Sequence, residues 1–152
     1  MKEIILNVEE IKNLIPHRSP MLLLDQVRLQ PPSKARSTYH VRGDEFFLQG
    51  HYPGNPLVPG NIQCEMLAQL GAVLVSYNSR EEDHPYYRIR KGKTPVLAAL
   101  NNVRFKAPVL PGDTIELSLV ILKDSGLVAS VEASAAVRNT ISVSLEMTVA
   151  YI

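Results

Sequence analysis

The C-terminal third of the sequence alternates between apolar and polar residues over unusually long runs. Its last run places Ile141, Val143, Leu145, Met147 and Val149 on one side of the chain, and two earlier runs at 115–121 and 127–137 follow the same period. A period of two predicts long strands with one buried face. The intervening segments 123–126 and 138–139 are short enough for hairpins, so we expect these strands to pair antiparallel.

The buried face of such a sheet needs a cover, and residues 61 to about 78 offer one long helix for it. Its stretch from Met66 to Tyr77 reads MLAQLGAVLVSY and is apolar on nearly every side, which is typical of a buried helix. We therefore predict an α+β fold in which a curved antiparallel sheet wraps around a long central helix.

The N-terminal half gives weaker signals. Asn7 is placed to cap a short helix over VEEIKNLI, which Pro16 would end. Residues 21–29 and about 35–41 read as strands on either side of the Pro31-Pro32 break.

Length and composition indicate one ordinary globular domain over residues 1–152. The chain is 45% hydrophobic and 20% charged, and its net charge of +1 favours neither nucleic acid nor a membrane as a partner. A single cysteine, Cys64, fits a reducing compartment. We find no signal peptide, no apolar run long enough to cross a bilayer, and no motif for nucleotide or zinc chemistry. We expect a soluble cytoplasmic protein.

Candidate chemistry is concentrated in HYPGNPLVPGNIQCEMLAQ, residues 51–69. Glu65 stands in the apolar helix, where loss of solvent favours the protonated carboxyl that a general acid needs. His51 is a candidate base, held relative to the helix by three conformationally restricted prolines. Gly60 would begin the helix, where free backbone N–H groups and the absence of a side chain let a ligand oxygen approach. Together these groups suit proton abstraction next to a carbonyl.

Each of these residues also has a simpler interpretation. Asn61, Glu65 and Gln69 share one helix face, which could be a solvated edge rather than a face toward a cavity or a partner subunit. An isolated histidine is usually structural, and a proline-rich segment can be a ligand for another domain. We favour the functional interpretation because apolar residues surround the carboxylate on both sides.

Over this segment the sequence resembles the 3-hydroxyacyl-[acyl-carrier-protein] dehydratases of the FabZ type, whose motif has the form H-[FY]-P-G-x-P-x-x-P-G-x-x-x-x-E-x-[ML]-A-Q. PHRSPMLLLDQV (16–27) and VRFKAPVLPGD (103–113) are similar to two further family segments. The resemblance implies a hot-dog fold with its active site in a tunnel between two subunits, in dimers that commonly form trimers of dimers. It makes His51 the base, Glu65 the group that assists departure of the β-hydroxyl, and the Gly60 N–H the donor to the thioester carbonyl. It implies no metal and no redox cofactor.

Some positions depart from the family pattern. Asn61 and Gln63 are polar where the family usually has apolar residues, and Val96 falls near the place where some members have a tunnel-gating tyrosine. Glu65 favours the dehydration-only branch, since related dehydratase-isomerases carry aspartate there. From the resemblance we predict the following tunnel residues: Tyr52, Pro53, Pro59, Asn61, Gln69 and Val96.

A basic cluster after the helix is a candidate docking surface for the acidic acyl carrier protein that the resemblance implies, although a solvated loop is the commoner meaning of such a cluster. Its members are Arg88, Arg90, Lys91 and Lys93. We add Arg104, which lies in the family segment 103–113. Among the other histidines, His17 belongs to a family segment without a clear chemical role, and His40 and His84 read as strand and loop residues.

Two alternative functions stay open. A hot-dog thioesterase would use a carboxylate near the same helix to activate water, and the His-Tyr-Pro-Gly match speaks against it. A non-catalytic subunit that binds the acyl carrier protein gains slight support from the polar Asn61 and Gln63.

Overall fold

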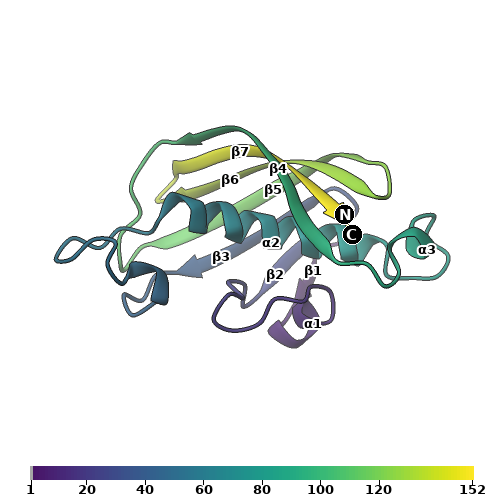
Figure 1. Ribbon diagram of the computed structural model, residues 1–152, viewed down its shortest axis with the longest axis horizontal. Coiled ribbons are helices and arrows are strands. Elements are labelled where there is room, and N and C mark those ends of the chain that lie inside the picture. The colour runs from purple at the N-terminus through teal and green to yellow at the C-terminus, as the bar shows by residue number, and fades with distance from the viewer. Residues whose placement is uncertain (1) are drawn as a thin grey trace.

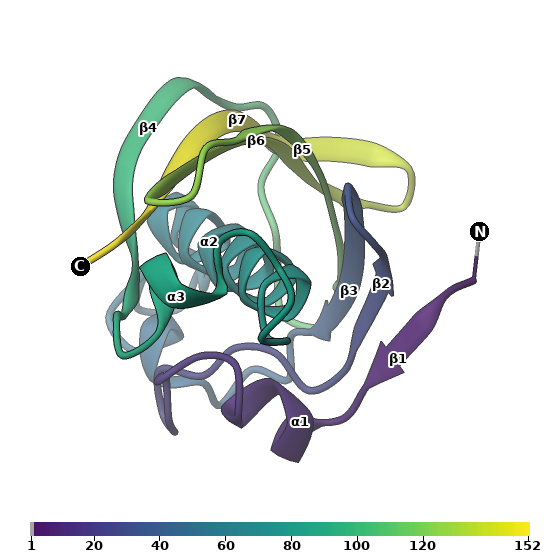
Figure 2. The same ribbon diagram turned by 90° about the vertical axis from the view of Figure 1, so that its right-hand side faces the viewer.

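A single curved sheet wraps around one long helix in this protein (Figures 1 and 2). The computed structural model describes residues 2–152, and within them seven strands form one antiparallel sheet in the order β1-β2-β3-β5-β6-β7-β4. The strands are β1 (Ile4–Leu6), β2 (Val27–Gln30), β3 (Lys34–His40), β4 (Pro95–Phe105), β5 (Thr114–Asp124), β6 (Val128–Val137) and β7 (Thr140–Tyr151). The helices are α1 (Val8–Lys12), the 3₁₀ turn η1 (Phe46–Leu48), α2 (Gly60–Asn78) and α3 (Tyr87–Arg90). This arrangement confirms the predicted α+β architecture.

The central helix α2 is the predicted one, and it begins at Gly60, one residue earlier than expected. From Met66 to Val75 every residue is buried, as the all-round apolar sequence indicates. At Gly71 an added Cβ would lie 2.8 Å from the terminal methyl group of Met147, so this side chain packs directly on the helix at the glycine. The core of the protein therefore lies between α2 and the concave face of the sheet.

The alternation of the C-terminal strands is confirmed over most of their length. Leu117 of β5 faces Ala135 of β6, and both side chains are buried against α2. The β6–β7 hairpin turns at Arg138 and Asn139, which both have positive φ (49° and 63°), as a tight two-residue hairpin requires.

The predicted alternation of buried and exposed side chains does not hold at the start of β7. Ile141 was expected on the buried face but is 37% exposed, whereas the neighbouring Ser142 is 1% exposed. Val143 pairs with Ala135 and Ile141 with Ala136, so Ser142 is an extra residue without a partner in β6. Such a bulge turns the side chains before it in β7 to the other face. A serine therefore enters the core at this position.

The N-terminal segment differs from the prediction in two ways. Asn7 does cap α1, in a capping box with Glu10, but the helix ends at Lys12, well before Pro16. The strand expected over 21–29 covers only Val27–Gln30. Residues 21–26 form a loop instead, whose Leu23 and Leu24 are buried, so this apolar run reflects packing on the core rather than strand pairing.

Strand β4 forms one edge of the sheet and pairs only with β7 in the part of the chain that the structure describes. Its side chains are mostly exposed, among them Leu97, Leu100 and Phe105. A long edge strand that exposes apolar side chains is a surface on which another chain can pair. Among residues 2–152, no helix combines the length and the apolar character needed to span a membrane.

Candidate active site

His51 lies in the loop between η1 and α2, and the loop itself holds the imidazole ring. The Nδ1 atom of His51 is 2.9 Å from the carbonyl oxygen of Leu57, while the Leu57 N–H donates to the His51 carbonyl at 2.8 Å. A carbonyl oxygen only accepts, so Nδ1 carries the proton and Nε2 of the neutral ring is left as a base. The Tyr52 ring stacks on the imidazole, with the ring centroids 4.2 Å apart.

The start of α2 lies beside this loop. Pro59 precedes the helix, and the fixed φ of proline suits that position. Gly60 is the first helical residue, so its N–H group has no acceptor within the helix. An added Cβ on Gly60 would lie 2.5 Å from the Phe105 ring, which gives the glycine a packing reason beside the predicted one.

A cavity of about 690 Å³, here called the His51 cavity, connects these groups. Gly60, Asn61 and Gln63 contribute to its wall from α2, and Phe105 to Pro108 close another side. Of the predicted tunnel residues, Tyr52 and Asn61 line this cavity, whereas Pro53 and Pro59 do not.

Glu65 is partly buried and contacts one residue of its own helix and one residue of the segment before β2. Nε2 of Gln69 donates to Oε1 of Glu65 at 2.9 Å, and Nε2 of His17 lies 3.5 Å from the same oxygen. A second cavity of about 260 Å³, here called the Glu65 cavity, is lined by His17, Glu65 and Val96 among others. The position of His17 beside Glu65 was not predicted, although its place in a family segment was a signal that could have pointed to it.

Within one chain, His51 and Glu65 line different cavities. The reason lies in the helix geometry: Glu65 follows Gly60 by five residues, which turns its side chain by roughly 140° around α2. One chain therefore presents a base in one cavity and a carboxyl group in another.

Gln69 differs from its predicted role as a tunnel residue. It is 1% exposed, and its amide binds the loop before β2: Nε2 donates to the Met21 carbonyl at 2.7 Å and Oε1 accepts from the Leu23 N–H at 2.9 Å. This amide replaces the strand partner that residues 21–23 lack. Gln69 thus ties the loop to α2 and orients Glu65 at the same time.

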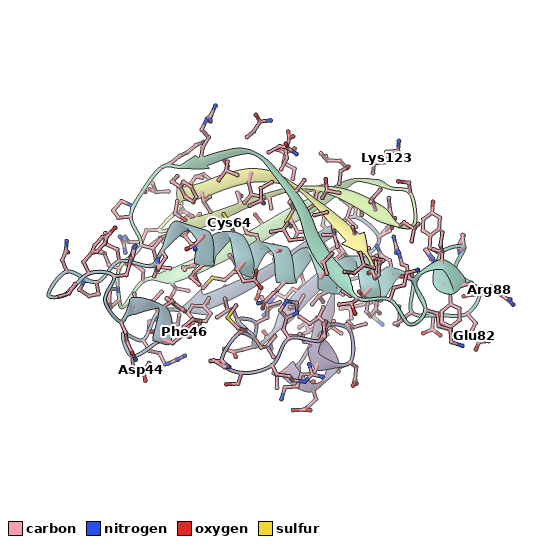
Figure 3. The ribbon with its side chains drawn as sticks, in the orientation of Figure 1. Asp44, Phe46, Cys64, Glu82, Arg88 and Lys123 are labelled. Carbon is pink, nitrogen blue, oxygen red and sulfur yellow. The ribbon has the colours of Figure 1, made fainter. Side chains whose placement is uncertain are left out.

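The predicted docking residues do not form one patch. Arg90 is 5% exposed, and its guanidinium binds the Gly126 and Val75 carbonyls, the Ser79 hydroxyl and the Asp124 carboxylate, so it is not available to a partner. Arg88, Lys91 and Lys93 are exposed near α3, and Figure 3 shows Arg88 at the opposite end of the molecule from Phe46, which precedes the His51 loop. Arg104 lies at the far end of β4, next to Phe105 of the His51 cavity.

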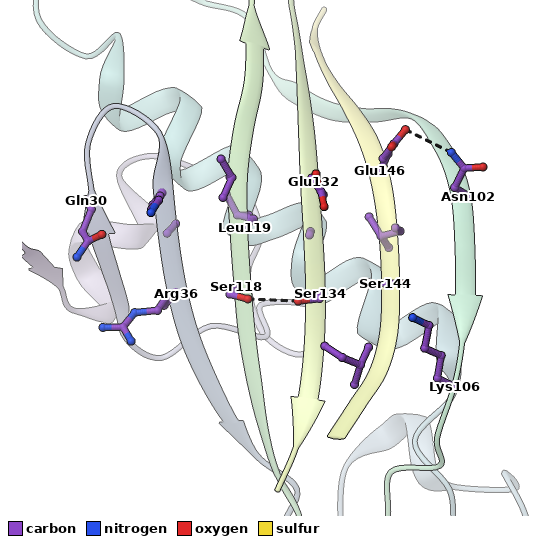
Figure 4. A pocket seen from close by; sticks show the side chains of 16 residues that line it. Gln30, Arg36, Asn102, Lys106, Ser118, Leu119, Glu132, Ser134, Ser144 and Glu146 are labelled. Carbon is purple, nitrogen blue, oxygen red and sulfur yellow. Dashed lines mark hydrogen bonds between the residues drawn. The ribbon is translucent and has the colours of Figure 1, made fainter. Parts of the chain in front are cut away.

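A third hollow, of about 680 Å³, lies on the outer face of the sheet (Figure 4). Its polar side chains bind one another across the strands: Ser118 contacts Ser134 at 3.3 Å, and Asn102 donates to Glu146 at 3.5 Å. The sheet separates it from α2, and it contains neither His51 nor Glu65. We therefore place the candidate active site in the two cavities along α2.

A sheet wrapped around one apolar helix, with a histidine loop before the helix and a carboxyl group on it, defines a hot-dog domain of the FabA-like class. The FabA-like domain model matches residues 15–145. The dehydratase heterocomplex ApeI:P from Xenorhabdus doucetiae has the same fold, with a TM-score of 0.76 and 20% identity over 93% of this chain and 90% of that one.

Relatives in sequence narrow the class. A 3-hydroxyacyl-[acyl-carrier-protein] dehydratase FabZ of Clostridium perfringens is 41% identical over 142 residues, which are 93% of this chain and 96% of that protein. The corresponding protein of Clostridium beijerinckii is 44% identical over 124 residues, 80% of this chain and 81% of that protein. The chain belongs to the FabZ family of 3-hydroxyacyl-[acyl-carrier-protein] dehydratases.

Proposed function

We propose that this protein dehydrates a (3R)-3-hydroxyacyl thioester on acyl carrier protein to the trans-2-enoyl thioester. The observation that carries the proposal is the Nδ1 contact of His51 with the Leu57 carbonyl, because it leaves Nε2 as a base beside the start of α2. Family membership supplies the substrate class, and the reaction belongs to fatty acid biosynthesis or to a related polyene or polyketide route.

The reaction divides between three groups. Nε2 of His51 takes the proton from C2, and the electron pair of that bond forms the C2–C3 double bond. The C3–O bond breaks, and the leaving hydroxyl takes a proton from Glu65 and departs as water. The Gly60 N–H donates to the thioester carbonyl and stabilises the negative charge that develops there as C2 loses its proton.

A complete site on this scheme needs two chains. In one chain His51 and Glu65 line different cavities, and the exposed apolar edge strand β4 lies beside both: its Phe105 lines the His51 cavity and its Val96 the Glu65 cavity. We propose a two-fold dimer that joins the His51 cavity of one protomer to the Glu65 cavity of its partner. A trimer of such dimers stays an expectation from the resemblance. Light scattering tests the dimer, and a stable, active monomer would contradict it.

We propose that exposed arginine and lysine side chains bind the acidic acyl carrier protein. Arg104 is exposed beside the His51 cavity, and Arg88, Lys91 and Lys93 are exposed near α3, so these cations are available to an acidic carrier protein. Charge reversal, Arg104→Glu or Arg88→Glu, should raise KM for a carrier-linked substrate and leave KM for the same acyl group on pantetheine unchanged. An equal effect on both substrates would contradict docking. We also propose a cytoplasmic location, which the free thiol of buried Cys64 suits.

The test of function is incubation with a 3-hydroxyacyl carrier-protein substrate, followed by mass spectrometry. Loss of water from the acyl group supports the dehydratase. Release of a free acid would indicate a thioesterase, and an unchanged substrate would indicate a non-catalytic carrier-binding subunit.

A further inference from the structure

A buried polar pair joins α2 to β7 next to the reacting groups. Gln63 is 3% exposed and Ser142 is 1% exposed, and the Ser142 hydroxyl donates to Oε1 of Gln63 at 2.6 Å. Ser142 reaches the core only because the pairing of β6 with β7 shifts beside it. The same hydroxyl has a longer contact of 3.2 Å to the Ala135 carbonyl, so the shorter contact to Gln63 takes its single hydrogen.

In the structure Oε1 of Gln63 accepts from the Ser142 hydroxyl, which directs the Nε2 end of the amide away from β7. With Oε1 bound to Ser142, the Nε2 group carries two hydrogens, for which residues 2–152 supply no acceptor. Among the described residues, only Nδ1 of His17 is a side-chain polar atom that is both fully buried and without a partner. Nε2 of Gln63 is therefore accessible to solvent. Because Gln63 lines the His51 cavity, that access is to the cavity. The pair therefore presents a fixed N–H donor to whatever occupies the cavity.

The donor lies beyond the position where the thioester would react. Gln63 follows Gly60 by three residues, which places it on the same side of α2 and about 4.5 Å further along the helix axis. We place the thioester carbonyl at the Gly60 N–H and C2 at His51, with the acyl chain beyond C3 running along α2 toward Gln63. A substrate that fills the cavity displaces the water at this donor, so the site discriminates against a substrate that offers the donor no acceptor.

We propose that Gln63 determines substrate specificity, and that the preferred 3-hydroxyacyl chain carries a hydrogen-bond acceptor oxygen shortly beyond C3 in place of a plain alkyl segment. This inference rests on the proposed dehydratase function. Ser142 acts as the positioning residue, because it holds Oε1 and so directs Nε2 to the cavity.

The test compares substrates of nearly equal shape. The reference is the 3-hydroxyoctanoyl thioester, and the probes are its 5-oxa and 6-oxa analogues, in which an ether oxygen replaces one methylene group. For wild type we expect kcat/KM for at least one analogue to exceed that of the alkyl substrate by about tenfold. In Gln63→Leu this preference should vanish or reverse. The ratio of the two rates does not depend on how much of a variant is folded.

Further variants show whether a lost preference comes from the missing amide donor or from altered packing of the core. Gln63→Leu combined with Ser142→Ala removes both polar partners, which should restore the thermal melt while the preference stays lost. Ser142→Ala alone should weaken the preference, because the amide is then no longer oriented. Ser118→Ala, which removes a hydroxyl from the outer face of the sheet, should leave the preference unchanged.

Several results would overturn the inference. One is a wild-type ratio within about twofold of unity for both analogues. The others are a preference that survives in the double variant and a preference that is lost in Ser118→Ala. Absence of turnover on all three substrates is a different result: it would reject the dehydratase function itself, and the inference with it.

Discussion

Nε2 of His17 lies 3.5 Å from Oε1 of Glu65, the carboxylate oxygen that also accepts a hydrogen bond from Gln69. The other ring nitrogen of His17, Nδ1, is buried without a partner, so Glu65 is the polar contact of this ring among the described residues. We therefore predict that His17 positions the carboxyl group of Glu65.

His17→Leu should lower kcat by about tenfold and change its pH profile, because Glu65 loses one of the groups that orient it. His17→Gln, whose amide can donate from a similar position, should recover much of that loss. The measurements are kcat against pH and a thermal melt for each variant. Equal losses in both variants, with unchanged pH profiles, would reduce His17 to a packing residue.

His51→Ala should abolish dehydration and leave the fold intact. The imidazole is half-buried in a loop, and removal of a general base typically lowers the rate by about 10²–10⁴-fold. Turnover in both the hydration and the dehydration direction measures the loss, and the thermal melt of the same sample controls for folding. Activity within about tenfold of wild type would reject the role of base.

Mixing His51→Ala with Glu65→Gln protomers should restore activity, because a mixed dimer contains one intact pair of these residues. With equal amounts and random exchange, about half the dimers are mixed and each has one working site of two, so recovery should approach roughly a quarter of wild type. Native mass spectrometry of differently tagged protomers verifies the exchange. No recovery after verified exchange would contradict a site shared between two chains.

Gly60→Ala should destabilise the protein by about 1 kcal/mol, because the new methyl group meets the Phe105 ring. It should also lower kcat/KM by about tenfold or more, since the substrate oxygen must approach the same backbone. Adding Phe105→Ala separates the two effects: the thermal melt should improve while kcat/KM stays low. Full recovery of activity in the double variant would show that the glycine serves packing alone.

The segment before His51 should lose stability in acid. Burial alone would raise the pKa of Glu45, but N–H groups of Arg42 and Gly43 and the Tyr39 hydroxyl donate to its carboxylate and lower that pKa overall. The stabilisation is complete above the ordinary pKa of about 4.3 and is lost as pH falls through the lowered value in the folded state. Thermal melts between neutral pH and about pH 3 should therefore fall more steeply for wild type than for Glu45→Gln. Parallel curves would contradict this role.

Much of the fold could be predicted because its signals are local and repeated. Alternation along β5, β6 and β7 reports which face of each strand is buried, and the apolar stretch from Met66 to Val75 reports a buried helix. Asn7 was identifiable as a cap because its partner Glu10 is three residues away. The motif around His51 and Glu65 was equally accessible, since its spacing is contained in one short segment.

By itself, the sequence determined which residue types were present and which segments had to be buried. Only the tertiary structure decided the partner of each polar side chain, because those partners are far apart in the chain. Gln69 binds Leu23, Arg90 binds Asp124 and Ser142 binds Gln63, and in each case burial forces a polar group to find a partner that local pattern does not reveal. The same geometry assigned His51 and Glu65 to different cavities, because the rotation of α2 and the packing of the sheet around it set the direction of each side chain.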